Sequence, residues 1–504
     1  MRKIVMISSS NDLGGKYFVV FSTIFLSVLT ALAITVNFYY FLIFPVGLSA
    51  VAIISFVLRS NDSFAERLLL YSAVIYLVLS FLWPRYVAFW IPGFPSVNLQ
   101  RVANIVVLFV MFSSLFSVRS FRDRVVRSFK AFPFFWVCLL IFEIFRFASV
   151  LFSKDFVTSL YQFFNELFVH AVFVFLGVLF GSSERYLKIF VYSVAMCLVV
   201  AFLVGVAETL NQGNLFARFV DPENSYVQWA LSNKIRGGEY RAQSTFGHPL
   251  TFAEFAAVGL CVSLGLLCLR RSSSSNYLIA MLIVVVGVGS VLLARSRAGY
   301  AAAAVSCFFI FIGPLLVGLL KGRLTLKGLV FWFFSIGFIF IAFVVVAFIV
   351  FDHAFGSRSF DVSNSARITM FTRGGELLLE SPVVGYGLGL AAEVIGVRAY
   401  SGVSRYTIDS LLLSYAVDSG VFAILAFVGC LVAVFLSLFR SLLASKGSEW
   451  YIWYGLIVAV VSFVVFKLIL SLSDNNFFMF MIFGIAVSAM ATPRVSSRFG
   501  SLRR

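Results

Sequence analysis

Basic residues at the edges of apolar segments are the part of this 504-residue chain best suited to chemistry on an anion. Arg241 and His248 belong to the stretch YRAQSTFGHPLTFAE (240–254), in which a polar segment runs into an apolar one. Pro249 suits the first turn of a helix, because its missing N–H would be unpaired there. A helix N-terminus carries about half a positive charge, and an arginine just before it completes a site for an anion, typically a phosphate. The alternative is a basic loop that anchors on lipid headgroups.

A second basic cluster, ARSRAG (294–299), forms a very short connection between two apolar stretches. Arg297 falls at the start of the second stretch, where a cation at a helix N-terminus is unfavourable by ~0.3–1 kcal/mol. A bound anion would remove this conflict, whereas the alternative is that Arg295 and Arg297 reach lipid phosphates. We predict an anion site that includes Arg297, with Arg295 as a further candidate.

Candidate bases lie near the edges of the same kind of segment. Asp409, in YTIDS (406–410), precedes an apolar stretch, and it could cap a helix, take a proton from a hydroxyl nucleophile, or do both. His248 is a second candidate, although a lone histidine at a membrane interface is more often a hydrogen-bonding anchor. Asp418 lies further into the apolar stretch and suggests a polar interior face. The three histidines show no metal-ligand spacing, so we expect no metal and no other cofactor.

The elements that must position these residues are predicted to be membrane-spanning helices. The chain is 61% apolar with 62 Phe and only 12% charged residues, whereas a soluble protein carries roughly 25% charge. Apolar runs near twenty residues long span a bilayer as helices, so the fold class is an all-α, polytopic transmembrane bundle. We expect about fourteen spans, near 18–36, 38–58, 68–83, 102–118, 132–152, 166–180, 189–208, 249–269, 277–294, 298–320, 328–351, 410–439, 451–472 and 477–491.

The +17 net charge could suggest nucleic acid, but the basic residues lie in short loops between apolar runs. Lys and Arg concentrate in alternate short loops, which marks those loops as cytoplasmic and places both termini inside. The expected division is N-terminal spans (1–208), a long outer loop (209–248), further spans (249–351), a second long outer loop (352–409) and C-terminal spans with a basic tail (410–504).

The second outer loop is predicted to contain an amphipathic helix, 366–379, which carries Arg367. Gly385, Gly387 and Gly389 follow it, and they mark a loop whose backbone can approach something closely. This GYGLG segment lacks a preceding strand, so we do not interpret it as a nucleotide fingerprint.

Several charged residues fall inside the expected spans. Glu143 with Arg146, and Glu166 with His170, have the spacing of pairs along one helix, which predicts self-paired intramembrane charges. Glu254 and Lys467 have no such partner on their own helices, so each should face the bundle interior or a wet cavity. Glu254 is therefore a further site candidate. The six cysteines all fall in apolar runs, and we expect them to be buried and unpaired.

Four segments together resemble the bacterial O-antigen ligase and polysaccharide polymerase family. They are RAQSTFGHP from Arg241, the ARSRAG hairpin, SARITMFTRGGELLLESPVVGYGLG from Ser365, and IDSLLLSYAVDSG from Ile408. The resemblance covers roughly 241–436. Two positions depart from the family pattern: Ser244 stands where glycine is common, and Asp409 stands where the ligases usually have a histidine followed by asparagine.

The resemblance implies an enzyme that joins glycans at the outer face of the inner membrane, with an undecaprenyl-diphosphate-linked oligosaccharide as donor. It implies that Arg241 and Arg297, and in third place Arg295, hold the diphosphate. Our own hypothesis from the residues is that Asp409, or else His248, acts as base. Arg367, Asp418 and Glu254 are secondary candidates. The departure at Asp409 favours a polymerase over a ligase, and a flippase and a structural scaffold are the non-enzyme alternatives. Expected partners are the lipid-linked donor and acceptor, membrane lipids, and chain-length regulator and export proteins, but no nucleic acid.

Overall fold

The computed structural model describes residues 62–89, 98–220, 227–228, 231, 235–236, 238–269, 273–320, 358–397, 406–446 and 448–491. The helices are α3 (Asp62–Leu82), α4 (Leu99–Ser117), α5 (Arg119–Ala131), α6 (Pro133–Leu151), α7 (Phe156–Gly181), α8 (Glu184–Leu210), η1 (Ala217–Phe219), α10 (Pro249–Ser263), η2 (Leu264–Leu269), α11 (Ser273–Ala294), α12 (Arg297–Leu320), α14 (Arg358–Glu380), α15 (Ala391–Ile395), α16 (Leu411–Ala444), α17 (Trp450–Ile469) and α18 (Asn476–Met490). Two short antiparallel strands, β1 (Ile235–Arg236) and β2 (Glu239–Tyr240), pair Ile235 with Tyr240.

Within these ranges, nine helices are long and apolar enough to cross a membrane, and two shorter apolar helices accompany them. They confirm the predicted helical membrane protein. Eleven of the expected spans coincide with helices, whereas those at 18–36, 38–58 and 328–351 lie outside the described residues. Of the cysteines, five have described side chains, and all five are free; four are buried and Cys307 is half-buried.

Helix α7 begins ten residues before the predicted start at Glu166. Asp155 caps it, because its carboxylate accepts a hydrogen bond from the Thr158 N–H at 3.1 Å. The polar residues that follow remain helical because their side chains find partners inside the bundle: Gln162 donates to Glu166, which pairs with Arg146.

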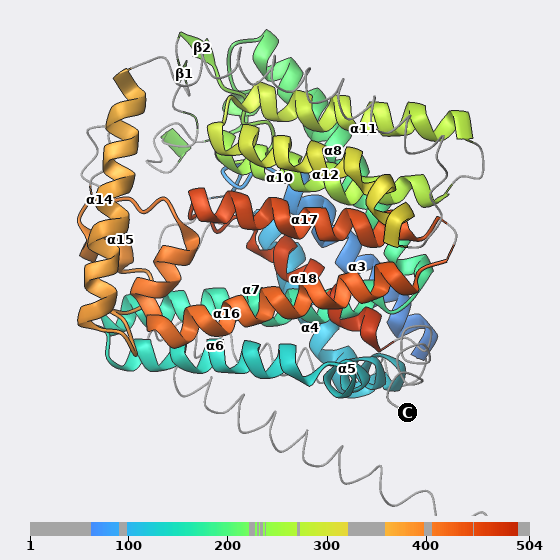
Figure 1. The fold of residues 1–504 in the computed structure, drawn as a ribbon, viewed down its shortest axis with the longest axis horizontal. Helices are drawn as coiled ribbons and strands as arrows, with labels where there is room; N and C mark the ends of the chain where they lie inside the picture. The colour runs from blue at the N-terminus through green and yellow to red at the C-terminus, as the bar shows by residue number, and fades with distance from the viewer. Residues whose placement is uncertain are drawn as a thin grey trace, which may run out of the picture.

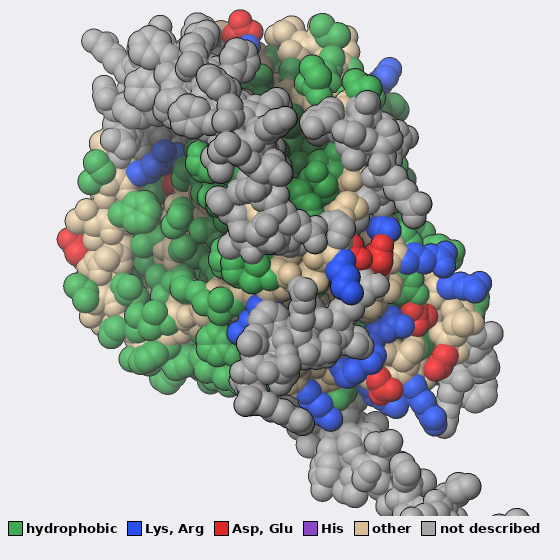
Figure 2. All heavy atoms as spheres, turned by 45° about the vertical axis from the view of Figure 1, so that its right-hand side comes forward, with side chains coloured by type: hydrophobic (Ala, Val, Ile, Leu, Met, Phe, Trp, Pro, Cys, Tyr) green, Lys and Arg blue, Asp and Glu red, His purple; other side chains and the backbone are tan. Residues whose placement is uncertain are grey.

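The long helices run between two ends of the molecule (Figure 1). Helix α14 stands across one end, close to β1 and β2, and we call this the α14 end. Helix α5 lies at the opposite end, the α5 end. Figure 2 turns the α5 end toward the reader and shows Lys and Arg side chains gathered there, with acidic ones among them.

Helix α5 occupies a charged segment that we predicted to be a loop. Its sequence RSFRDRVVRSFKA buries Phe121, Val125 and Ser128, which recur at helical spacing, and turns its basic residues outward. One stripe of buried side chains is enough to hold an amphipathic helix against a bundle. Arg124 is anchored to Glu66 of α3 at 2.8 Å.

Close helix contacts in the core depend on glycine. Gly177 and Gly181 of α7 are four residues apart and face Gly484 and Ile485 of α18. Small residues at this spacing let two membrane helices approach closely. Phenylalanines fill the neighbouring space: the ring centroid of Phe81 lies 4.1 Å from that of Phe255 and 5.1 Å from that of Phe478.

We expect Gly177→Ala to destabilise the bundle by about 1–3 kcal/mol, the usual cost of overpacking a core. A Cβ at Gly177 would lie 2.1 Å from the Met481 carbonyl oxygen and 2.8 Å from the Gly484 Cα, and backbone atoms cannot move aside cheaply. Thermal unfolding in detergent measures the loss. Gly259→Ala in α10 is the matched control, because its Cβ would meet nothing closer than 3.7 Å. Equal stability of the two variants would contradict the packing assignment.

Candidate functional site

The Arg241 loop and the ARSRAG hairpin lie against each other at the α14 end. The Ala242 N–H donates to the Leu293 carbonyl at 3.0 Å, and Arg241 Nε donates to the Ala294 carbonyl at 3.2 Å. Two segments far apart in the sequence are thereby joined, and the start of α12, Arg297, follows the hairpin directly. The structure thus brings Arg241 and Arg297 to the same end of the bundle.

The hairpin is also packed tightly against α10. A Cβ at Gly299 would lie 2.9 Å from the Ala253 Cβ, so glycine is required for this approach. Ser296 is fully buried and caps α12, because its Oγ accepts a hydrogen bond from the Gly299 N–H at 3.1 Å. The N-terminal turns of α10 and α12 therefore lie side by side.

Arg295 is placed differently from its neighbours. Its backbone has a φ of 48°, and its side chain pairs with Glu239 of β2 at 3.0 Å, with exposed fractions of 36% and 58%. Such exposed ion pairs contribute only about 0–1 kcal/mol. Arg295 is therefore directed to the surface strand, which weakens its candidacy as a diphosphate ligand.

His248 is the N-cap of α10. Its Nδ1 accepts a hydrogen bond from the Leu250 N–H at 3.1 Å. A neutral imidazole has one acceptor nitrogen, so a proton taken up at Nδ1 would break the cap. This geometry favours the anchoring role over general-base catalysis.

Asp409 lies beside Arg367 of α14, with Oδ2 3.2 Å from Nε, and both side chains are about one-third exposed. The interpretation of Asp409 as an N-cap is wrong, because Ser410 caps α16 by accepting from the Leu413 N–H at 3.4 Å. The preceding carbonyl, of Ile408, accepts a hydrogen bond from Ser471. Asp409 is thus a partly exposed carboxylate at the α14 end, in contact with a cation that sequence analysis ranked only as secondary.

Asp418 serves the fold rather than an open site. It is buried, Oδ1 accepts from the Ala391 N–H at 2.8 Å, and Oδ2 accepts from Ser414 at 3.2 Å. Its carbonyl accepts from the Gly387 N–H at 3.1 Å and from Ser149 at 2.5 Å. Both carboxylate oxygens therefore bind groups of the chain itself.

The glycine loop makes the close backbone approach that its sequence predicts. Gly385 and Gly387 have φ values of 67° and 112°, and a Cβ on either would meet Asp418 or Ser153 within 2.5 Å. Gly420 has a φ of 80° and interrupts α16 at the same contact. The approach is to α16, to the residues that follow α6 and to the first turns of α7.

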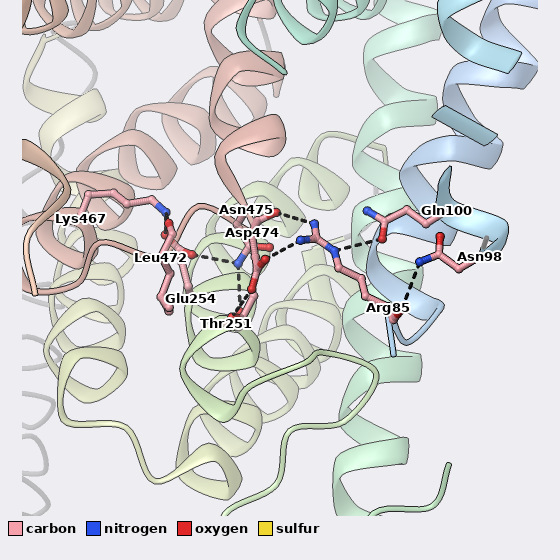
Figure 3. Close-up of polar contacts among 9 residues, drawn as sticks. All are labelled: Arg85, Asn98, Gln100, Thr251, Glu254, Lys467, Leu472, Asp474 and Asn475. Atoms are coloured by element: carbon pink, nitrogen blue, oxygen red, sulfur yellow. Dashed lines mark hydrogen bonds and ion pairs between the residues drawn. The ribbon is translucent and has the colours of Figure 1, made fainter. Parts of the chain in front are cut away.

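A chain of polar contacts runs through the bundle beside α10 (Figure 3). Glu254 and Lys467, 0% and 3% exposed, pair at 2.8 Å, which confirms that both face the interior. Asn475 donates to Glu254 Oε2 at 3.0 Å. Beside it, Asp474 accepts from Thr251 at 3.0 Å and pairs with Arg85 at 2.5 Å.

Sequence analysis missed the partners in this chain. Arg85 and Asp474 lie in connections next to spans, where a polar residue usually meets water or headgroups. Only the fold shows that these connections meet at the first turn of α10.

The shortest ion pairs among the buried charges of α6 and α7 join the two helices. His170 Nδ1 lies 2.6 Å from Glu143, and Arg146 pairs with Glu166. Arg146 and Glu143 also pair along α6 at 3.9 Å, which confirms the predicted pair. The predicted pair of Glu166 with His170 is therefore wrong, while the prediction that these charges neutralise one another holds.

Residues 282–428 match the O-antigen ligase family model. The matched segment contains the ARSRAG hairpin, α14, the glycine loop and Asp409, whereas Arg241 and His248 precede it. No curated protein matches the chain. Through this segment the chain is similar to the O-antigen ligase family, and the match supports a membrane protein that transfers glycans.

Proposed function

We propose that the protein is a polysaccharide polymerase that joins undecaprenyl-diphosphate-linked repeat units at the periplasmic face of the bacterial inner membrane. The product would be exopolysaccharide, capsule or O-antigen. The observation that supports this function is the hydrogen-bonded union of the Arg241 loop with the Arg297 hairpin. The basic α5 end is the cytoplasmic one by the preference of Lys and Arg for that side, so the α14 end faces the periplasm.

In this mechanism the undecaprenyl tail lies among the spans and the diphosphate lies at the α14 end. Arg241, Arg297 and the N-terminal turns of α10 and α12 bind the diphosphate. Asp409 takes the proton of the acceptor sugar's hydroxyl as its oxygen attacks the anomeric carbon of the donor. The anomeric C–O bond breaks, and undecaprenyl diphosphate leaves with the electron pair. The cations stabilise the charge that builds on this leaving group.

Asp409→Asn and His248→Asn separate the two candidate bases. We expect Asp409→Asn to lower kcat by about 100-fold or more, because general-base catalysis contributes at least that much. His248→Asn should keep most activity, because asparagine also caps helices well. Turnover of a purified lipid-linked repeat unit measures both. An inactive His248→Asn protein together with an active Asp409→Asn protein would reverse the assignment.

The reaction itself is tested with purified protein in liposomes that hold only the lipid-linked repeat unit. A polymerase lengthens the glycan into a ladder and releases undecaprenyl diphosphate. A ligase, the second candidate and the one that the name of the matched family favours, transfers glycan only when a separate lipid acceptor is added. A flippase moves the substrate across the bilayer without forming product. Either of the last two results would contradict the proposed polymerase.

A further inference from the structure

Glu208, near the end of α8, is a buried carboxylate that organises the Arg241 loop. Its side chain is 1% exposed. Oε2 accepts from the Gln243 N–H at 2.9 Å and from the Ser244 N–H at 2.6 Å. Oε1 accepts from the Tyr240 hydroxyl at 3.1 Å and from Asn214 Nδ2 at 3.0 Å. All four donors are neutral, and they satisfy a charge that would be costly to bury unpaired.

The backbone of the loop is shaped to receive this carboxylate. Ser244 has a φ of 54°, in the left-handed region that favours glycine. Successive backbone N–H groups beside such a residue form a concavity that binds anions. Here the anion is Glu208, so the N–H groups of Gln243 and Ser244 are already occupied. The Ser244 hydroxyl also donates to the Ala201 carbonyl at 2.7 Å, which explains how serine replaces the glycine common in the family.

The loop is held on its other side by the hairpin. Arg241 Nε donates to the Ala294 carbonyl at 3.2 Å, and Tyr240, just before it, donates to Glu208. Burial raises the pKa of the Tyr240 hydroxyl, and the Glu208 carboxylate raises it further, so Tyr240 stays a donor. Arg241 thus stands between contacts to Glu208 on both sides in the sequence: Tyr240 precedes it, and Gln243 and Ser244 follow it.

We propose that Glu208 is a positioning residue for glycan transfer, which fixes the loop so that Arg241 is aimed at the donor's diphosphate. The inference rests on the proposed function, and it assigns Glu208 no contact with substrate. A binding group that is held in place before the ligand arrives binds it more tightly than one that must first be ordered. The buried Glu208 carboxylate, which accepts four hydrogen bonds, can hold the loop in this way.

Glu208→Gln tests the proposal, because its amide nitrogen would face the Tyr240 and Asn214 donors in place of an acceptor oxygen. We expect the KM for the lipid-linked donor to rise about tenfold, the effect of losing roughly 1.4 kcal/mol of binding, with a smaller change in kcat. Adding Ser244→Gly to the Glu208→Gln protein should lower the KM part of the way back to its original value. Glycine adopts a positive φ without the hydrogen bonds to Glu208. Glu376→Gln, an exposed carboxylate on α14, is the matched control and should leave KM unchanged.

Two further variants keep the test decisive if Glu208→Gln does not fold. Tyr240→Phe and Asn214→Ala together remove both donors to Oε1, and we expect them to raise the donor KM as well. Suppose that Arg241→Ala weakens binding of the donor. An unchanged KM in Glu208→Gln, or a fall in kcat alone, then overturns the positioning role. If Arg241→Ala has no effect, the proposed function fails first and this inference fails with it.

Discussion

Replacing Arg241 or Arg297 by alanine is expected to stop polymer formation, with kcat/KM lowered by about 100-fold or more. In the proposed mechanism each arginine supplies charge where the diphosphate becomes the leaving group, and each is fixed by the fold. Arg241 is bonded to the hairpin through Ala294, and Arg297 begins α12. In cells, lipid-linked single repeats should accumulate, and gel analysis of the extracted glycans measures this.

The hairpin offers its own control. Arg295→Ala removes a charge only two residues from Arg297, but Arg295 is paired with Glu239 at the surface, so we expect nearly normal polymer. Arg241→Lys should retain part of the activity, because lysine keeps the charge and loses the bidentate geometry. Normal chain length in both Arg241→Ala and Arg297→Ala would remove the basis of the assignment.

Breaking the buried pair of Glu254 and Lys467 is expected to have the largest effect on stability. Both side chains are almost fully buried and lie 2.8 Å apart. Lys467→Met leaves the Glu254 carboxylate with Asn475, and Glu254→Gln leaves the Lys467 ammonium with the Leu472 carbonyl. Each single change should lower the free energy of unfolding by about 3–5 kcal/mol, because it leaves an uncompensated buried charge. Unfolding in detergent, followed by heat or denaturant, measures the loss.

The double variant Glu254→Gln, Lys467→Met should be more stable than either single variant, since it leaves no buried charge unpaired. Arg373→Ala, which breaks an exposed pair with Glu376 on α14, is the matched control and should cost only about 0–1 kcal/mol. Additive losses in the double variant would show that the two residues do not stabilise each other.

Much of the fold could be predicted because lipid imposes a simple rule on sequence. Runs of apolar residues near twenty long must be helices, and eleven of the expected spans are helices in the described residues. Helix α5 was not predicted because its outward face is charged, although Phe121 and Val125 recur at helical spacing. The early start of α7 was not predicted, because its polar residues find their partners only in the folded bundle: Ser159 donates to the Leu388 carbonyl, and Gln162 donates to Glu166.

The candidate site was predictable to the extent that its residues sit at the ends of helices. Arg241, His248, Arg297 and Asp409 all lie where loops meet spans, and the structure gathers Arg241, His248 and Arg297 around the starts of α10 and α12. Pairings between helices could not be predicted, because nothing in the sequence near Glu254 or Lys467 indicates that the two residues are partners.

Glu208 was missed for a related reason. Two of its partners are backbone N–H groups, which every residue but proline possesses, so nothing in the sequence singles them out. A carboxylate near the end of a span is usually expected to be exposed to water, so Glu208 was not considered as a buried residue.

In the proposed mechanism Arg241 and Arg297 bind the same diphosphate. The most direct measurement is equilibrium binding of undecaprenyl diphosphate to the purified protein in lipid nanodiscs. We predict that Arg241→Ala and Arg297→Ala each weaken binding about tenfold or more, that the double variant is little worse than either, and that Arg295→Ala binds like the unaltered protein. Undiminished binding in both single variants would contradict the claim.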